Sequence, residues 1–358
     1  MKIPIRMKAA LYRAPGQPLE LAEVSVPTPG EGEVLVKVAA TGICHSDLHI
    51  LDGEMIPPPE GFILGHEVSG WVAELGPRCE NPHGLSPGDP VVVSWIIPCG
   101  KCYWCARGQE NYCPYAAARM PGLIGLNGGH AEYMAVPETA VFPIPKGVDV
   151  HTAAVISCAY GTAYRALREA GTGPGTSLVV VGVGGVGLAA VELAGALGAR
   201  PIVAVDVRES ALKKAEELGA THTVDASGGD PLSTVREILP QGADVVYETK
   251  PNPDLKLALE TVRRGGTIVV TGLGTSTLEI PASHLVMNGI RVVGSLGYKP
   301  RTDIPELLSL AAAGKIDPRR LVSHRYRPEE INQAYQSLRQ GKHHRAVVIW
   351  GPQPPGNP

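Results

Sequence analysis

The sequence predicts an α/β fold in two parts, a β-rich domain and a doubly wound parallel-sheet domain inserted into it. Three observations predict this fold. Short apolar segments separated by Gly and Pro fill the chain to about residue 155, strand-like and helical segments alternate from Ser177, and the tail ends in another strand-like segment. Short strands with frequent turn signals are typical of all-β regions, whereas alternating strands and helices indicate βαβ units. The 358 residues suffice for about two domains.

The first part has three segments with strand character, at 33–42, 66–76 and 89–98. Each is rich in Val and is bounded by Gly or Pro, which are the residues that end strands. The next segment, 151–171, is rich in Ala and ends at a Gly. Those features predict one continuous helix over 151–171.

The second part alternates regularly between apolar strands and helices. Five segments are expected as strands, at 178–182, 201–206, 243–249, 267–272 and 290–295. Helices are expected at 187–198, 210–220 and 254–266. The tail is expected to add helices at 302–316 and 328–341 and a strand at 345–350. This order predicts a parallel sheet inserted into the β-rich domain.

Composition excludes several classes of function. Apolar residues make up 44% of the chain, the net charge is −3, and no Lys/Arg-rich run occurs, so we expect neither disorder nor a nucleic acid or membrane partner. The first residues lack the apolar core of a signal peptide. The uncharged stretch 170–191 is interrupted by Gly and Pro, which argues against a membrane span. We therefore expect a cytoplasmic protein.

Four of the seven cysteines form one compact motif. Cys99, Cys102, Cys105 and Cys113 follow the spacing C-x2-C-x2-C-x7-C. Four thiolates on one short lobe can surround zinc with no open position, as a structural site requires. An iron–sulfur cluster is the rival interpretation, because C-x2-C-x2-C also occurs in ferredoxins. Four reduced cysteines without a metal are the third.

Cys44, His66 and Cys158 offer a second set of zinc ligands. A three-ligand site leaves a fourth position for a substrate. The spacing of these residues does not by itself show that they converge in space. Taken singly, each cysteine is more simply explained as a small buried apolar residue, and His66 as a satisfied histidine of the core.

A nucleotide site is predicted where a strand ends and a helix begins. Gly182, Gly184 and Gly187 have the spacing G-x-G-x-x-G, with Gly185 and Val186 between them. Such a turn lets the backbone approach a pyrophosphate, which the helix N-terminus then binds.

Asp206 ends the following strand, 19 residues after Gly187. A carboxylate there accepts hydrogen bonds from the adenosine ribose and repels a 2′-phosphate, which favours NAD over NADP. Arg208 complicates this prediction, because a nearby guanidinium can attract that phosphate. Asp206 could alternatively be a helix N-cap or an acidic residue of a loop.

These motifs together resemble the zinc-dependent alcohol dehydrogenases of the medium-chain dehydrogenase/reductase superfamily. The similarity covers essentially the whole chain, and the segment GICHSDLH is most similar to the yeast and bacterial branch. The resemblance implies a GroES-like catalytic domain over 1–159 and 296–358, with a four-cysteine lobe at 95–115. It also implies a Rossmann cofactor domain over 160–295. A subunit would carry one catalytic and one structural zinc ion, and the expected assembly is a homotetramer, with a dimer as the alternative.

The resemblance also assigns roles around the catalytic zinc, for which Cys44, His66 and Cys158 would be the ligands. Asp47 would orient the zinc-bound histidine, and Glu67 would lie behind the metal. Ser46 and His49 would form a proton relay, in which the serine hydroxyl passes the alcohol proton through the cofactor ribose to the histidine. As alternatives, Asp47 is a turn residue, Glu67 and His49 are surface residues, and Ser46 is a structural hydroxyl.

Cofactor and substrate contacts follow from the same resemblance. His45 and Arg345 would contact the pyrophosphate, and Thr162 would pack on the nicotinamide. Trp95 and Met55 would face the substrate, and the large Trp95 would favour slim substrates. Each of these residues has a plainer alternative, as a surface charge, a helix residue or part of the core.

The implied reaction is the reversible oxidation of a primary or secondary alcohol by hydride transfer to NAD. Zinc would polarise the substrate oxygen, and the cofactor would carry the hydride. The alternatives are an NADPH-linked aldehyde or ketone reductase and a polyol dehydrogenase with the same zinc site. A zinc-free quinone or enone reductase is a further alternative, although the three expected ligands argue against it.

Overall fold

In the computed structural model the chain forms two compact units. The first consists of Met1–Cys158 and Tyr298–Pro358, and the second of Ala159–Gly297. The structure describes residues 2–253, 255–274 and 277–351. Within those ranges, no helix has both the length and the apolar character needed to cross a membrane.

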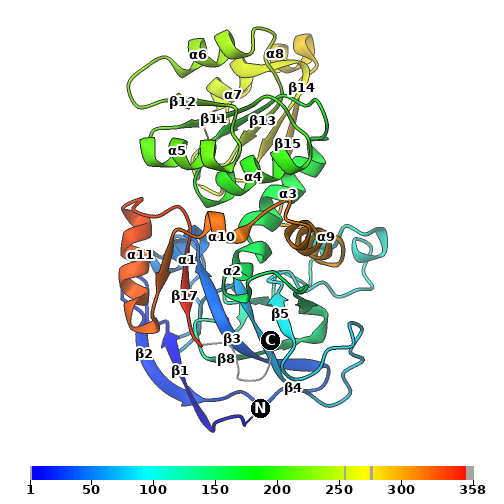
Figure 1. The fold of residues 1–358 in the computed structure, drawn as a ribbon, viewed down its shortest axis with the longest axis vertical. Helices are drawn as coiled ribbons and strands as arrows, with labels where there is room; N and C mark the ends of the chain where they lie inside the picture. Colours follow the sequence, from blue (N-terminus) through cyan, green and yellow to red (C-terminus); the bar gives the residue numbers. More distant parts are fainter. Residues whose placement is uncertain (1, 254, 275–276, 352–358) are drawn as a thin grey trace. The chain divides into compact units, whose positions relative to one another are not determined.

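The first unit is built on a seven-stranded sheet (Figure 1). Its strand order is β16-β17-β3-β4-β5-β9, and β8 also pairs with β3; only β16 and β17 run parallel. The strands are β3 (Glu33–Ile43), β4 (Val68–Leu75), β5 (Pro90–Val93), β8 (Tyr133–Pro137), β9 (Val141–Pro143), β16 (His324–Tyr326) and β17 (Ala346–Ile349). The C-terminal segment thus completes the N-terminal sheet, since β17 pairs directly with β3.

The alternation of side chains along β3 explains how this sheet holds two apolar clusters. Val34, Val36 and Val38 lie in the larger cluster, whereas Leu35 lies in a second cluster with Met7. Successive residues of a strand point to opposite faces, so one Val-rich strand supplies both. The first unit also contains two small sheets, β1 (Arg6–Leu11) with β2 (Glu20–Ser25) and β6 (Met120–Pro121) with β7 (Gly125–Leu126).

Short helices complete the first unit. The α-helices are α1 (His45–Leu51), α2 (Val150–Ala153), α9 (Pro300–Ala312), α10 (Pro318–Leu321) and α11 (Ile331–Arg339). The 3-10 turns are η1 (Cys105–Arg107), η2 (Glu110–Tyr112), η3 (Glu138–Ala140), η4 (Ala154–Ser157) and η5 (Pro328–Glu330). Helix α1 begins directly after β3, and this places its first turn beside the cysteine that ends the strand.

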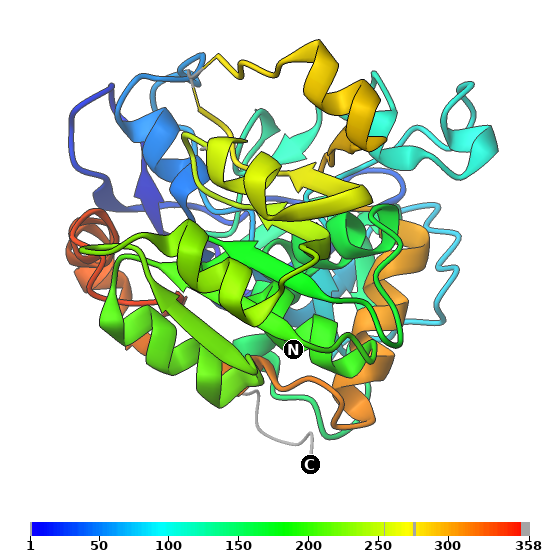
Figure 2. The same cartoon turned by 90° about the horizontal axis from the view of Figure 1, so that it is seen from above.

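The second unit contains six parallel strands in the order β12-β11-β10-β13-β14-β15. Figure 2 draws this unit in green and yellow. The strands are β10 (Leu178–Val181), β11 (Ile202–Asp206), β12 (His222–Asp225), β13 (Ala243–Glu248), β14 (Val262–Val270) and β15 (Arg291–Gly294). The helices are α3 (Ala159–Glu169), α4 (Gly185–Ala196), α5 (Glu209–Leu218), α6 (Pro231–Ile238), α7 (Leu255–Thr261) and α8 (Ala282–Asn288). The strand order reverses between β10 and β13, the point at which such sheets bind ligands at the carboxyl ends of their strands.

The α/β fold expected from the sequence is therefore confirmed, with local corrections. The strand expected over 89–98 ends at Val93, and β12, α6 and α8 were not among the expected elements. The helix expected over 151–171 is broken at Cys158, whose backbone (φ −136°, ψ −69°) separates η4 from α3. The helix expected over 254–266 ends at Thr261, and its first residue lies outside the described ranges. Val262 instead opens β14 and pairs with Ala243 of β13, so strand pairing overrides the local helical pattern there.

Candidate active site

The four-cysteine lobe has the geometry of a closed zinc site. Its Sγ atoms are 3.5 Å apart for Cys102 and Cys105, 3.8 Å for Cys102 and Cys113, and 4.0 Å for Cys99 and Cys105. A tetrahedral zinc with Zn–S bonds of about 2.3 Å needs sulfur atoms about 3.8 Å apart. All seven cysteines of the chain are free thiols, so these short distances are not disulfides. The lobe therefore fits a zinc ion held by four thiolates.

An ion pair between the buried Glu110 and the exposed Arg301 anchors the lobe to α9. Glu110, which is 2% exposed, accepts a hydrogen bond from the backbone N–H of Arg301 at 3.2 Å and pairs with the guanidinium of the same residue. That guanidinium also donates to the carbonyl of Cys105 at 3.3 Å. The chain segment that carries the cysteines is thus tied to a helix almost 200 residues away in the sequence.

The structure brings the second set of predicted ligands together. Cys44, His66, Glu67 and Cys158 are all buried, and one ligand atom from each lies within 4.8 Å of the others. The Sγ atoms of Cys44 and Cys158 are 3.9 Å apart, again the separation that zinc requires. Cys158, one of these residues, is also where the helix expected over 151–171 is broken, and sequence periodicity gave no sign of that break. Hydrogen bonding to Cys158 lowers the pKa of Cys44 well below its usual value, which favours the thiolate that a metal needs.

Asp47 fixes the orientation of His66. The Nδ1 atom of His66 lies 3.0 Å from Oδ1 of Asp47, and Asp47 is completely buried. The second oxygen of Asp47 accepts a hydrogen bond from the backbone N–H of Cys44 at 3.2 Å, which closes a capping box at the start of α1. With Nδ1 engaged, His66 has Nε2 left for a metal.

Glu67 forms a buried ion pair with Arg345. Both side chains are almost fully buried, and one guanidinium nitrogen of Arg345 lies 3.9 Å from Sγ of Cys44. Burial raises the pKa of Glu67, and the adjacent guanidinium of Arg345 opposes that shift. Gly42 is required for this arrangement, because a Cβ atom there would lie 2.0 Å from the Glu67 carboxylate. The sequence could not reveal this pair, since 278 residues separate its members.

The predicted relay residues both lie on α1. The Oγ atom of Ser46 is 3.8 Å from Sγ of Cys44. His49 follows three residues later, a spacing that places two side chains on the same side of a helix. Its Nδ1 atom is 2.5 Å from Oε2 of Glu54, a partner that the sequence did not suggest. His45, at the first position of the same helix, is exposed.

Trp95 lies beside His66, and Tyr298 packs against Trp95. The ring of Trp95 meets that of His66 edge to face at 6.3 Å and that of Tyr298 at 5.6 Å. Tyr298 is fully buried, and its hydroxyl accepts the backbone N–H of Trp95 at 3.2 Å. Sequence reasoning missed Tyr298 because nothing links it to Trp95 along the chain. Met55 is partly buried and packs against the core of the same unit.

The second unit carries the predicted nucleotide turn directly after β10. Gly182 has a φ of +85°, and a Cβ atom on Gly187 would lie 2.1 Å from the carbonyl oxygen of Gly182. Both positions therefore require glycine. A Cβ atom on Gly184, the N-cap of α4, would instead meet open space. Gly185 and Val186 open α4 and so belong to the turn whose N–H groups have no intrahelical partner.

Asp206 lies at the carboxyl end of β11, beside that turn. Its Oδ2 accepts the backbone N–H of Val183 at 2.8 Å. Its Oδ1 accepts from Arg208 twice, from the backbone N–H at 3.0 Å and from Nε at 3.2 Å. The guanidinium that could attract a 2′-phosphate is thus already paired with the carboxylate that would repel one. Thr162 is partly buried on α3.

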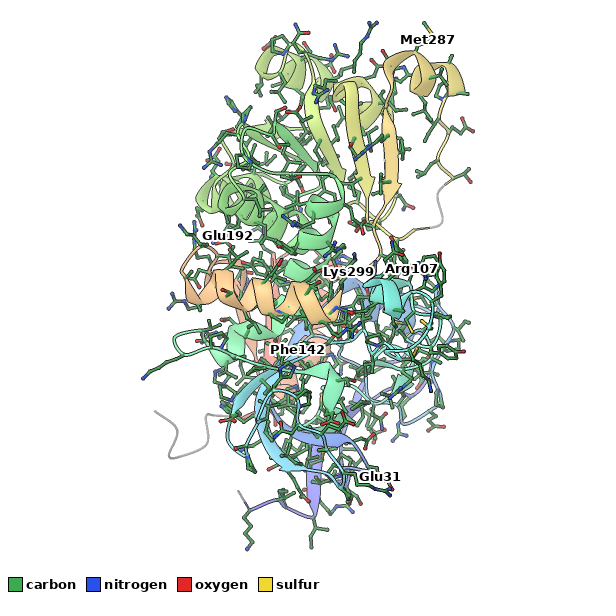
Figure 3. All side chains as sticks on the ribbon, turned by 90° about the vertical axis from the view of Figure 1, so that its right-hand side faces the viewer. Glu31, Arg107, Phe142, Glu192, Met287 and Lys299 are labelled. Carbon is green, nitrogen blue, oxygen red and sulfur yellow. The ribbon has the colours of Figure 1, made fainter. Side chains whose placement is uncertain are left out.

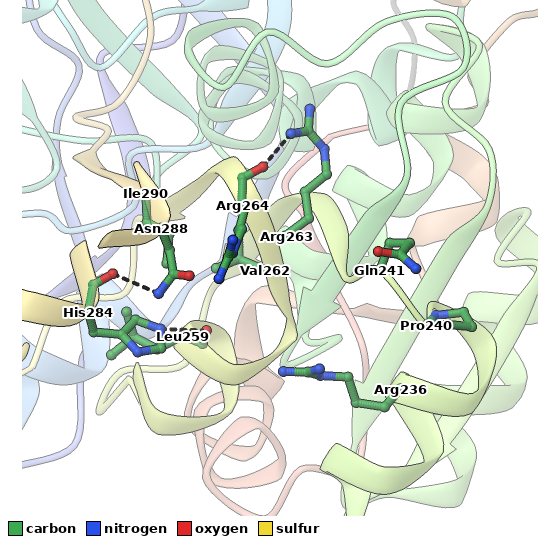
Figure 4. A pocket seen from close by; sticks show the side chains of 10 residues that line it. All are labelled: Arg236, Pro240, Gln241, Leu259, Val262, Arg263, Arg264, His284, Asn288 and Ile290. Carbon is green, nitrogen blue, oxygen red and sulfur yellow. Dashed lines mark hydrogen bonds between the residues drawn. The ribbon is translucent and has the colours of Figure 1, made fainter. Parts of the chain in front are cut away.

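A separate pocket in the second unit, with a volume of about 240 Å³, lies at the opposite ends of the strands (Figure 4). Val262 and Ile290 mark the amino ends of β14 and β15 there. Arg263 is bound to Asp244 at 2.6 Å, and Arg236 donates to the carbonyl of Glu260 at 2.7 Å. Parallel sheets of this order bind nucleotides at the carboxyl ends of their strands, so we do not assign this pocket to the cofactor.

Comparison with known proteins agrees with this geometry. Residues 30–146 match the family model of the alcohol dehydrogenase GroES-like domain, and residues 185–313 match that of the zinc-binding dehydrogenases. The chain is 35% identical to an alcohol dehydrogenase of Geobacillus stearothermophilus, over 96% of this chain and 98% of that one. It is 34% identical to the NAD-dependent alcohol dehydrogenase of Sulfurisphaera tokodaii, over 90% and 94% of the two chains.

A solved structure gives the same result. The alcohol dehydrogenase TADH from Thermus sp. ATN1 superposes with a TM-score of 0.88 and 31% identity, covering 96% of this chain and 99% of that one. Fold, ligand sets and sequence similarity agree over nearly the whole length. The chain belongs to the zinc-dependent, NAD(P)-linked alcohol dehydrogenases of the medium-chain dehydrogenase/reductase superfamily.

Proposed function

We propose that this enzyme oxidises primary or secondary alcohols reversibly with NAD, using a catalytic zinc held by Cys44, His66 and Cys158. The observation that carries the proposal is the convergence of these three buried residues, with ligand atoms spaced for one metal ion. Cys99, Cys102, Cys105 and Cys113 would hold a second, structural zinc. When bound, the catalytic zinc supplies Lewis-acid activation of the alcohol oxygen, and the nicotinamide accepts the hydride.

The charges around the catalytic site support this assignment. Two thiolates balance the charge of one divalent cation, and Glu67 balances Arg345 in the adjacent ion pair. A buried site is stable only when its charges are paired in this way. Asp47 keeps His66 in the tautomer that leaves Nε2 for the metal.

Cofactor selection rests on the second unit. The N–H groups at the start of α4 would bind the pyrophosphate, and Asp206 would bind the ribose hydroxyls. We also keep His45, Arg345 and Thr162 as proposed cofactor contacts. Because Arg345 is buried against Glu67, it could contact only a cofactor group that reaches into the site.

The substrate proposed is a slim alcohol, aldehyde or ketone, because the large ring of Trp95, against which Tyr298 packs, lies beside His66. The experiment that tests the proposed function is alcohol-dependent NADH formation by the purified protein, measured for straight-chain, branched and secondary alcohols. Rates that fall with branching support the proposal. The proposal would be contradicted if no alcohol gave NADH and the protein instead reduced an enone or a quinone with NADPH.

The relay on α1 gives a direct prediction. We expect His49→Gln to lower kcat at pH 7 by about 10²-fold, because glutamine keeps a polar contact but cannot take up a proton. Added imidazole buffer should restore part of the lost rate. Glu54→Gln should have a smaller effect, since it removes only the partner of His49. His222→Gln, at an exposed histidine on β12, is the matched control. An unchanged kcat for His49→Gln would exclude the relay.

We further propose that the enzyme is a homotetramer, with a dimer as the alternative. In the second unit, β15 ends the six-stranded sheet, so its outer edge offers backbone groups for pairing. Helix α8 buries none of its residues, and Val286 and Met287 are 79% and 77% exposed. Met287 is labelled on this helix in Figure 3. Exposed apolar side chains and the end strand of a sheet are each typical of an association surface.

Light scattering of the purified protein tests this proposal. We expect the mass of four chains of 37.6 kDa each for the wild type and a smaller mass for Met287→Glu. Ile5→Glu, at an equally exposed apolar residue of the first unit, should leave the mass unchanged. A wild-type mass of one chain would overturn the proposal.

The cysteines of the two ligand sets also bear on the location of the protein. Because every cysteine is a free thiol and six of them lie in the two ligand sets, we propose a reducing compartment, the cytoplasm.

A further inference from the structure

A chain of buried hydrogen bonds extends from His66 into the core of the first unit. Beyond Asp47, the Oδ2 atom accepts from the hydroxyl of Tyr335 at 3.0 Å, and that hydroxyl is 2.6 Å from Nε2 of His130. The Nδ1 atom of His130 is 2.8 Å from Oγ1 of Thr41, which in turn accepts from the indole N–H of Trp350 at 2.9 Å. None of these side chains belongs to a residue more than 6% exposed.

At one end of this series of hydrogen bonds the group can only accept, and at the other end it can only donate. This fixes which atom donates in each hydrogen bond between them. A carboxylate only accepts, and so Tyr335 donates to Asp47. Its oxygen then accepts from Nε2–H of His130. Burial lowers the pKa of His130 to about 4, so the ring is neutral and its Nδ1 accepts from Thr41. At the far end the indole of Trp350 only donates, which agrees with this direction.

These hydrogen bonds connect parts of the sequence that lie far apart. Thr41 is on β3, His130 precedes β8, Tyr335 is on α11 and Trp350 follows β17. Close packing around His130 reinforces the arrangement. A Cβ atom on Gly65, the residue before His66, would lie 2.7 Å from Nδ1 of His130. Gly65 also has a φ of +91°, so glycine is required there for both reasons.

We propose that Tyr335 and His130 are positioning residues, which hold Asp47 and through it set the imidazole of His66 for metal binding. This inference rests on the proposed role of His66 as a zinc ligand. The argument is physical. Asp47 has one oxygen on His66 and the other on Tyr335 and the N–H of Cys44, so loss of Tyr335 leaves that second oxygen with the weaker contact at 3.2 Å. A carboxylate free to turn no longer fixes the imidazole.

The test is the rate of zinc release from the Tyr335→Phe holoenzyme to a chromogenic chelator. The phenylalanine keeps the ring in the core and removes only the hydroxyl. We expect the zinc held by Cys44, His66 and Cys158 to leave about 10- to 100-fold faster, which is the range for partners of metal ligands. The four-cysteine zinc is an internal reference whose release should not change. The absorption spectrum of the cobalt-substituted enzyme should also shift, because the ligand field depends on how His66 is held.

Matched variants separate positioning from simple destabilisation. Tyr12 is 1% exposed, and its hydroxyl has no hydrogen-bond partner within the described part of the chain. Tyr12→Phe should therefore leave both release rates unchanged. In the background of Asp47→Asn, Tyr335→Phe should add little further effect, since it acts through Asp47. His130→Phe should accelerate release in the same direction as Tyr335→Phe.

The outcomes are distinct. Unchanged release and an unchanged cobalt spectrum for Tyr335→Phe would overturn this inference, and so would additive effects with Asp47→Asn. If instead Cys158→Ser retained both zinc ions, the proposed zinc site itself would fail, and the positioning role with it.

Discussion

Replacing Cys158 by Ser is expected to remove one zinc ion per chain and to lower kcat/KM for alcohol oxidation by at least about 10³-fold. Cys158 is buried, its Sγ lies 3.9 Å from that of Cys44, and its backbone leaves the helical conformation at this residue. A serine hydroxyl is a poor zinc ligand at neutral pH, because zinc prefers thiolate and imidazole donors. Metal activation contributes several kcal/mol to the transition state, and about 4 kcal/mol corresponds to 10³-fold in rate.

The control for this variant is Cys79→Ser. Cys79 is half-buried and lies outside both ligand sets, with its thiol donating to the carbonyl of Glu33 at 3.1 Å. It should keep both zinc ions and normal activity. Metal content by mass spectrometry and steady-state kinetics on the two proteins check the prediction. A Cys158→Ser enzyme that keeps its activity while losing a zinc would show that the metal is not catalytic.

Replacing Asp206 by Ser is expected to lower kcat/KM for NAD by about 10- to 100-fold and to raise that for NADP by a similar factor. A hydrogen bond to a charged group contributes about 1.5–3 kcal/mol, which corresponds to this range. The substitution removes the carboxylate that would accept from the ribose. It also frees Arg208, whose Nε now lies 3.2 Å from Oδ1 of Asp206, to face a 2′-phosphate.

Two further variants make this prediction specific. Asp225 pairs in register with Asp206 on the adjacent strand β12 but is exposed, so Asp225→Ser should not alter cofactor preference. In the double variant Asp206→Ser, Arg208→Ala, the gain for NADP should disappear. Kinetics with both cofactors at a fixed alcohol concentration provide the test. If Asp206→Ser kept the preference of the wild type, the selectivity would have to reside outside this carboxylate.

Local patterns predicted much of the fold. The Val-rich segments at 33–42 and 178–182 are found as β3 and β10, and the glycine spacing predicted the turn into α4. The four cysteines of the lobe are close in sequence, so their clustering was also predictable. In these cases, the residues that interact are close in the sequence or recur with the period of a strand or a helix.

What remained out of reach depends on contacts between distant segments. Arg345 with Glu67, and Tyr335 with Asp47, are 278 and 288 residues apart, and no periodicity marks them. The break of the helix at Cys158 had no signal either, because its neighbours favour a helix. Only the fold brings these residues to one place, and this is why the family resemblance, and not the spacing, predicted the convergence of Cys44 with the other ligands.

The most direct test of the central claim is the zinc content of the wild-type enzyme, measured together with NAD-linked alcohol oxidation before and after brief chelation. We predict two zinc ions per chain, loss of activity in step with loss of the more labile ion, and recovery of activity when zinc is restored. One zinc ion per chain with full activity that survives chelation would contradict the claim that Cys44, His66 and Cys158 hold a catalytic metal.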